Sequence, residues 1–424
     1  MSQPATILGI LKQRNALLYF IPMALSLTAV IVRVSGLAYF INKVLGKTEA
    51  IPYIGYVITM NLAAGAIFGT VGGLLLSRFE SRRALQFVSV LSILQSVALA
   101  YITRHGENTP QADKMVAVWA VIIVSGIGSI PYAIDGICRN VLVKHALKDA
   151  NDHGLGTNIF TSLYNFGLIL STPIVVALVP LVGFGGLFLV IALTSIFLMV
   201  TLHAMDLSHL KAIPEWDGFR KEISAGLRYT FNNAGIRLCI GLSTVITIFG
   251  FAYNVLMVTI SSTMFSGTHN AFALLGLASG AGCALGTVIA LRYGETHRKR
   301  CVIGCCLTGG IAQILMAMTQ NIYVGEILMC CTGLGFMGSF MPLRGALATL
   351  IDNQHRTSFV IGVTFQSFFL GMSVSSTASS ALAKQFGCPT VLVICGLGLT
   401  LTGIITPMLS GIEKIDKAPA KKTT

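Results

Sequence analysis

Twelve runs of apolar residues, each about as long as a membrane is thick, dominate this chain of 424 residues and constrain its fold. A helix needs about 20 mostly apolar residues to cross the hydrocarbon core of a bilayer. Hydrophobic residues make up 54% of the chain and charged residues 11%, whereas about a quarter of the residues of soluble proteins are charged. We therefore predict an all-α membrane protein with 12 transmembrane helices. They cover roughly residues 17–42, 52–77, 84–103, 116–138, 158–180, 184–205, 236–263, 271–291, 301–319, 322–343, 358–383 and 389–410.

Lysine and arginine residues are unequally distributed between the two ends of these predicted helices. With both termini in the cytoplasm, 23 of the 29 fall at the cytoplasmic end, Arg33 lies inside the first run, and five fall outside: Lys43, Lys47, Arg104, Lys114 and Lys384. Cytoplasmic loops of membrane proteins carry such an excess. The prediction is a multi-pass protein of the cytoplasmic (inner) membrane with both termini cytoplasmic. Its basic loops are expected to contact membrane lipids, and no nucleic acid.

The sequence repeats at about half its length. "GGLLLSRFESRR" (72–83) after the second run resembles "GTVIALRYGETHRKR" (286–300) after the eighth, at an offset of 214 residues. "CRNVL" after the fourth run matches "LRGAL" after the tenth, which aligns Arg139 with Arg344 at an offset of 205 residues. Repeats of this kind are typical of transporters. We predict six-helix bundles at 1–205 and 236–424, the second with a short basic tail, in pseudo-symmetric arrangement.

The two bundles are joined by a polar segment at 206–235, which we predict to be a cytoplasmic linker. Apolar residues recur in it at helix-like spacing among charges, namely Trp216, Phe219, Ile223, Leu227 and Phe231. This spacing is typical of an amphipathic helix lying on the inner membrane surface. A plain tether is the alternative interpretation.

The loop after the second run carries a recognisable motif. It holds Gly73, Arg78, Arg82 and Arg83, and it resembles the signature loop of the major facilitator superfamily, in which arginines and an acidic residue latch the two halves together. Stretches such as "EISAGLRYTFNNAGIRL", "NAFALLGLASGAGCALGTVIA" and "PLRGALATLIDNQHRTSFVIGVTFQSFFLG" are similar to the drug and siderophore exporter branch that includes the enterobactin exporter. The resemblance implies two bundles around a central cavity lined by helices 1, 4, 7 and 10, with alternating access by rocking of the halves.

The chain departs from this family at three places. Ser77 stands where the signature loop usually has aspartate, "STPIVVAL" replaces the Gly-Pro and double-glycine antiporter motif of helix 5, and Arg33 stands where helix 1 often has an acid. We expect a weakened latch in the first half. Arg33 also leads us to expect a cationic cavity that favours an anionic cargo.

Charged residues within or bordering the predicted spans are few: Arg33, Asp135, Arg139, Glu326 and Arg344. A charge at the bilayer centre costs about 3 kcal/mol on insertion scales, so each indicates function. Asp135 and Arg139 have the i, i+4 spacing that brings side chains together on one helix face, just after Pro131. Three interpretations stay open for this pair. It neutralises itself at the inner interface, it forms an inner gate in which Asp135 exchanges between Arg139 and Arg344, or it contacts the substrate.

Arg33 and Glu326 belong to opposite halves and both lie toward the outer side. They are predicted to form an outer gate, although Arg33 alternatively binds an anionic substrate or extends toward the interface. Among uncharged polar residues, Tyr253 and Asn254 rank first as cavity residues because helix 7 should line the cavity. The other candidates are Asn61, Gln95, Asn158, Asn165, Gln313 and Gln366, and for any single one of these polar residues a hydrogen bond between helices is the favoured role.

Glycines at four-residue spacing mark two of the predicted helices, at Gly65, Gly69 and Gly73 and again at Gly276 and Gly280. Such faces let helix backbones approach closely in lipid, either for packing or as sliding surfaces. The ten cysteines show no C-x-x-C pair and no histidine partner, so we expect no metal and no cofactor.

These features favour transport over other functions. An intramembrane enzyme needs a nucleophile with a base, and a receptor usually adds a soluble domain. We expect a monomeric secondary transporter that binds a small-molecule substrate and protons. The favoured function is proton-coupled export of a siderophore or a similar anionic or amphipathic compound. A siderophore uptake permease, a general multidrug efflux pump and a lipid flippase are the alternatives.

Overall fold

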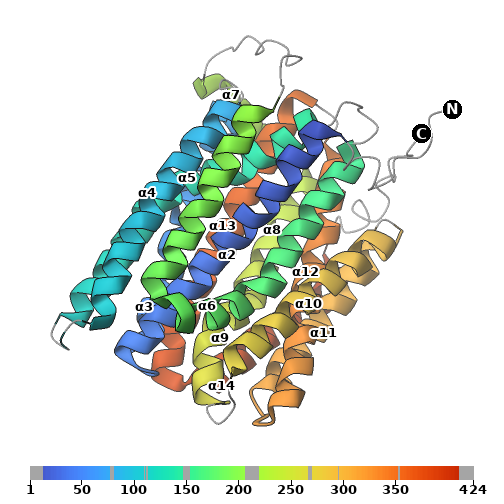
Figure 1. Cartoon of the computed structure of the whole chain (residues 1–424). Helices are drawn as coiled ribbons and strands as arrows, with labels where there is room; N and C mark the ends of the chain where they lie inside the picture. Colours follow the sequence, from blue (N-terminus) through green and yellow to red (C-terminus); the bar gives the residue numbers. More distant parts are fainter. Residues whose placement is uncertain are drawn as a thin grey trace.

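The computed structural model describes residues 13–76, 81–108, 110, 113–146, 153–205, 219–265, 270–294, 296–351 and 354–409. Figure 1 shows long helices running side by side in one bundle. Their bounds are α2 Arg14–Leu45, α3 Ala50–Leu76, α4 Ser81–Asn108, α5 Lys114–Ala146, α6 His153–Ala204, α7 Phe219–Asn232, α8 Ala234–Gly250, α9 Ala252–Thr263, α10 Ala271–Tyr293, α11 Arg298–Met316, α12 Ile322–Leu350, α13 Gln354–Phe386 and α14 Cys388–Ile405. Helices α2 to α6 are called the N-terminal half below, and α8 to α14 the C-terminal half.

The prediction of 12 spans in an all-α membrane fold is confirmed. Ten stretches of the described residues are helical, long and apolar enough to cross a membrane. One of them, 162–204, holds two spans, because Gly183 has φ 69° and ψ 175° and so interrupts α6. Glycine tolerates this positive φ, which strains other residues. The twelfth span is α13, whose many serines and threonines lower its hydropathy.

The two halves meet along two helix pairs, α3 with α13 and α6 with α10. In the α6 and α10 pair, a Cβ on Gly280 would overlap the backbone of Ile169, and one on Gly276 would overlap Thr172. In the α3 and α13 pair, Gly69 lies against the backbone of Gln366. The glycine spacing therefore predicted close helix approach correctly. Without a hydrophobic driving force between helices in lipid, such contact is a main source of their association.

Polar side chains add bonds across the same two pairs. The hydroxyls of Thr59 and Thr377 lie 2.9 Å apart, and Thr70 donates to the amide oxygen of Gln366. Asn165 Nδ2 donates to Thr287 Oγ1 at 3.1 Å across α6 and α10. These side chains make the contact between halves directional as well as close.

The linker contains a helix, α7, at the end of the bundle where α2 begins (Figure 1). Gly226 and Ile223 face Phe359 of α13, whereas Leu227 and Phe231 are 39% and 56% exposed. Trp216 of the predicted pattern lies outside the described residues. The helix is thus attached to the C-terminal half on one face and leaves apolar side chains on another.

Gly280→Leu should separate α6 from α10, because the new side chain occupies the space of the Ile169 backbone. Overpacking of this kind lowers the free energy of unfolding by about 3 kcal/mol at the upper end of the usual range. We expect a lower melting temperature in detergent and loss of transport. Gly304→Leu is the matched control, since nothing lies within 4 Å of a Cβ there. Equal melting temperatures for the two variants would contradict the packing role of Gly280.

Candidate transport site

A cavity lies between the two halves and is called the central cavity here. Its volume, counted as the space that the centres of water molecules can occupy, is ≈ 120 Å³. Six aromatic side chains line it: Tyr164, Phe251, Tyr253, Phe272, Phe336 and Phe368. Six polar side chains are interspersed: Ser35, Asn61, Ser171, Thr172, Asn254 and Ser279. Within the described part of the chain, no charged side chain lines this cavity.

Tyr253 and Asn254 reach the cavity from a break in the seventh span. Helix α8 ends at Gly250 and α9 begins at Ala252, with Phe251 between them. The break leaves the Phe249 carbonyl to accept a hydrogen bond from Gln313 Nε2 of α11 at 3.4 Å. Neighbouring helices commonly satisfy backbone groups freed in this way. The structure thus places both predicted residues on the cavity wall.

The Tyr253 hydroxyl belongs to a small polar cluster on α9 and α10. It lies 3.6 Å from Cys283 Sγ and accepts a hydrogen bond from Ser279 Oγ at 3.4 Å. All three residues are buried and line the central cavity. A hydroxyl held by such weak partners can exchange them for a polar group of a bound molecule.

An aromatic stack joins the two halves beside the central cavity, near the C-terminus of α2. The rings of Tyr39 in the N-terminal half and Phe272 in the C-terminal half lie 5.5 Å apart and within 3° of parallel. Phe272 also lines the cavity. Because the two rings belong to opposite halves, they must part when the halves separate at this end.

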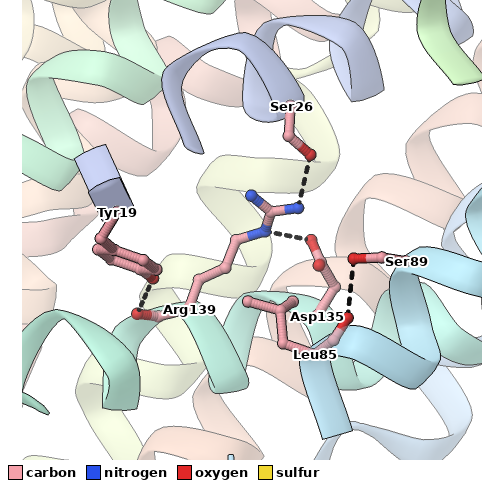
Figure 2. Close-up of polar contacts among 6 residues, drawn as sticks. All are labelled: Tyr19, Ser26, Leu85, Ser89, Asp135 and Arg139. Carbon is pink, nitrogen blue, oxygen red and sulfur yellow. Dashed lines mark hydrogen bonds and ion pairs between the residues drawn. The ribbon is translucent and has the colours of Figure 1, made fainter. Parts of the chain in front are cut away.

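The predicted pair Asp135 and Arg139 forms a buried ion pair inside the N-terminal half (Figure 2). Arg139 Nε donates to Asp135 Oδ2 at 2.7 Å, and Arg139 Nη2 donates to Ser26 Oγ at 2.9 Å. The Tyr19 hydroxyl donates to the Arg139 carbonyl at 2.8 Å. Asp135 and Arg139 are 4% and 3% exposed. The pair therefore joins α5 to α2 in the interior of the N-terminal half.

A second, smaller cavity borders this ion pair and is called the charged cavity here. It lies among α2, α4, α5 and α6 and is lined by Arg33, Asp135, Arg139 and the serines Ser26, Ser89, Ser92, Ser96 and Ser195. Its volume, counted in the same way, is ≈ 10 Å³. About this much is needed to hold one water molecule.

Arg33 faces the charged cavity, so the prediction that it lines the cavity between the halves is wrong for this conformation. Its Nη1 donates to Gln95 Oε1 of α4 at 2.5 Å, and Gln95 Nε2 donates to the Val124 carbonyl at 3.3 Å. Gly128 of α5 leaves the room that the Gln95 amide fills. The physical reason is helix rotation: each residue turns about 100°, which places Arg33 on a different face of α2 from Ile31 and Val34.

The two predicted gates are not formed in this conformation. Glu326 is half-buried near the start of α12, and Arg33 binds Gln95 instead of it. Arg344 lies over the rings of Phe365 and Phe340, 4.9 and 6.0 Å from their centroids, and within electrostatic range of Tyr164 in the other half. Asp135 binds Arg139 rather than Arg344.

The signature loop is only partly described. Arg78 lies outside the described residues, and Gly73 lies in the last turns of α3. Arg82 Nη2 donates to the His203 carbonyl at 2.7 Å and Nη1 to the Met205 carbonyl at 3.3 Å, whereas Arg83 is exposed. Arg82 thereby caps the C-terminal end of α6 within its own half, where a cation is favourable.

Helices in two halves around a cavity are an architecture of membrane transporters, and the family match places the chain in that class of protein, not among enzymes. The chain belongs to the Major Facilitator Superfamily, whose family profile matches residues 19–376 and, in a second and overlapping match, residues 242–423.

Relatives and solved structures agree with this membership. The chain is 20% identical over 361 residues to macrolide efflux protein A of Streptococcus pyogenes, covering 83% of this chain and 85% of that protein. The protein of that name from serotype M6 gives the same values. A D-xylose–proton symporter superposes with a TM-score of 0.68 at 18% identity, covering 96% of this chain and 99% of the other. The nucleoside transporter NupG gives 0.70 at 13% identity, covering 92% and 98%. These structures share the fold.

Arg139→Met should leave the Asp135 carboxylate buried without its counter-ion, which costs about 3 kcal/mol or more. Replacing both partners by apolar residues of similar size is usually far less costly. The double variant Asp135→Leu with Arg139→Met should therefore recover most of the melting temperature that Arg139→Met loses. Additive losses in this double-mutant cycle, measured by thermal unfolding in detergent, would show that the two side chains are not energetically coupled.

Tyr39→Ala should open one end of the central cavity, because it removes half of the stack with Phe272. Cys283 on the cavity wall is a native reporter. We expect faster modification of Cys283 by a membrane-impermeant maleimide added at the end of the bundle where α2 ends, measured by mass spectrometry of its peptide. Tyr56→Ala is the control, since that ring stacks on Trp119 at the same end but does not line the cavity. An unchanged rate in Tyr39→Ala would contradict the closing role.

Proposed function

We propose that this chain is a proton-driven exporter of an amphipathic small molecule without a strong net charge, which binds in the central cavity. The carrying observation is the cavity lining, in which aromatic and methionine side chains are interspersed with hydroxyl and amide groups. Pockets of this composition bind ligands mainly by apolar contact and orient them with a few hydrogen bonds. A polyanionic cargo would find no cation on the described wall.

Efflux is favoured as the direction because the sequence relatives carry that activity in their names. Macrolide efflux protein A matches most of this chain and is matched over most of its own length. Export of a siderophore, as expected from the resemblance to the enterobactin exporter, loses the support of Arg33, which lies in the charged cavity. It remains a second candidate, and an uptake permease, a general multidrug pump and a flippase are tested by the same experiment.

Asp135 is our candidate for the proton-binding group. It is a buried acid in a span, and its charge holds Arg139, which in turn holds Ser26 of α2. Protonation of the carboxylate removes that charge and releases the guanidinium to its other partners. Because α2 also lines the central cavity, a change in this bond reaches the cargo site through one helix.

The test uses the purified protein in inside-out proteoliposomes with a labelled macrolide, ethidium and a catecholate siderophore as separate cargoes. We expect the macrolide to accumulate when a pH gradient is imposed. Asp135→Asn should lose the response to the gradient while still exchanging cargo between the two sides at equal pH. Preferred accumulation of the siderophore, or of ethidium, would replace the proposed cargo class, and movement in the opposite direction would replace export.

Tyr253→Phe should weaken cargo binding, since it removes the one hydroxyl and leaves the ring in place. Loss of a single neutral hydrogen bond is worth about 1 kcal/mol, which corresponds to a rise in KM of about fivefold. Transport kinetics in the same vesicles measure it. Tyr323→Phe is the control, because that side chain is 73% exposed and far from the cavity wall. Equal KM values for wild type and Tyr253→Phe would remove Tyr253 from the binding site.

A further inference from the structure

The two cavities of this protein lie on opposite faces of α2. Ser26, Ala29 and Arg33 line the charged cavity, whereas Ile31 and Val34 line the central cavity. Among the described residues, Val30 alone lines both. One valine side chain therefore borders both the cavity that Asp135 lines and the proposed cargo site.

The charged cavity has the chemistry of a proton path. Its five serine hydroxyls each donate and accept hydrogen bonds, and it has room for about one water molecule. Among the described residues, the charged and titratable groups near Asp135 are Arg139 and Cys138 on α5 and Arg33 and Tyr19 on α2. From α4 and α6 the described lining brings only serine hydroxyls and the apolar Val88 and Ile191.

The central cavity also carries polar groups, and it shares Val30 with the charged cavity. Ser35 on α2 and Tyr164 and Ser171 on α6 line the central cavity, as does Asn61 on α3. Water in the central cavity would hydrogen bond to these groups whenever that cavity opens to one side of the membrane. A proton would then reach Asp135 from the cargo side, with no cargo bound, unless an apolar group interrupts the chain of water and hydroxyls.

We propose that Val30 is this interruption: it separates the proton site from the cargo site, so that protons cross only in step with cargo. The proposal rests on Asp135 being the proton-binding group of the proposed exporter. An apolar branched side chain suits the role because it makes no hydrogen bond and is held in few rotamers. Val30 thereby acts in coupling by separating the two sites, in addition to lining the central cavity.

Val30→Thr is the sharpest test, since threonine keeps the size and shape of valine and adds one hydroxyl. Val30→Ala opens a gap instead and serves as a second variant. In proteoliposomes without any cargo, with pyranine trapped inside, both should collapse an imposed pH gradient several-fold faster than wild type. Val30→Ile should keep the wild-type rate, because it preserves the apolar barrier.

Two further variants test whether the proton leak passes through Asp135. Ile31→Ala removes a larger side chain from the central cavity alone, so it should alter cargo KM without a leak. Val30→Thr combined with Asp135→Asn should return the leak to the wild-type rate, because the proton then has no carboxylate to reach. A wild-type leak rate in folded Val30→Thr and Val30→Ala, or a leak that persists in the combined variant, would overturn the proposal.

The result is independent of the cargo. If Asp135→Asn alone leaves gradient-driven transport intact, the proposed coupling fails, whatever the Val30 variants show. If Asp135→Asn abolishes that response but neither Val30 variant leaks, the coupling stands and the barrier is wrong.

Discussion

The ion pair between Asp135 and Arg139 is the interaction around which the N-terminal half is arranged. A charge in the hydrocarbon core must be matched inside the protein, since lipid offers it no partner. The match here extends from α5 to Ser26 of α2, and Tyr19 ties the same helix to the Arg139 carbonyl. The guanidinium of Arg33 is held likewise by Gln95 of α4. Three helices are thus joined by charge-assisted bonds, which are stronger than neutral ones.

The ion pair and Arg33 lie beside the charged cavity and not beside the central cavity in the described part of the chain. With the buried charges gathered in the charged cavity, the described wall of the central cavity is left to aromatic, methionine, hydroxyl and amide groups. A surface of this kind accepts varied apolar shapes, because methionine side chains adapt and aromatic rings offer broad contact. In the described residues the two cavities thus differ in chemistry, with these buried charges beside one and an uncharged, largely apolar wall around the other.

The fold could be predicted from the sequence where a single physical rule decided the outcome. Apolar run length determined the spans, and glycine spacing located the close contacts of Gly276 and Gly280 with α6. The i, i+4 spacing of Asp135 and Arg139 predicted their bond, because helix geometry alone brings them together. The break of α6 at Gly183 lay in the predicted gap between the fifth and sixth runs.

The rest of the site depended on helix rotation and on contacts between helices far apart in sequence. The face of α2 that carries Arg33 could not be read from a helix that is apolar nearly all round, so its partner Gln95 was missed, although Gln95 stood out as a polar residue in a span. Tyr39 and Phe272 gave no signal among 23 phenylalanines and 11 tyrosines. Nor could the sequence show that Arg344 lies over two rings.

The internal repeat identifies equivalent positions in the two halves, and the partners of the arginines at one such position differ. The offset of 205 residues that aligns Arg139 with Arg344 also aligns Asp135 with Phe340. At the same place in each half, an arginine meets the residue one turn before it on its own helix, a carboxylate in α5 and an aromatic ring in α12. A cation over a ring is attracted by the quadrupole of the ring, which no proton can abolish. The carboxylate, in contrast, loses its charge on protonation. The repeat has thus kept an arginine at the equivalent place in each half, while the described residue one turn before it is ionisable in α5 and aromatic in α12.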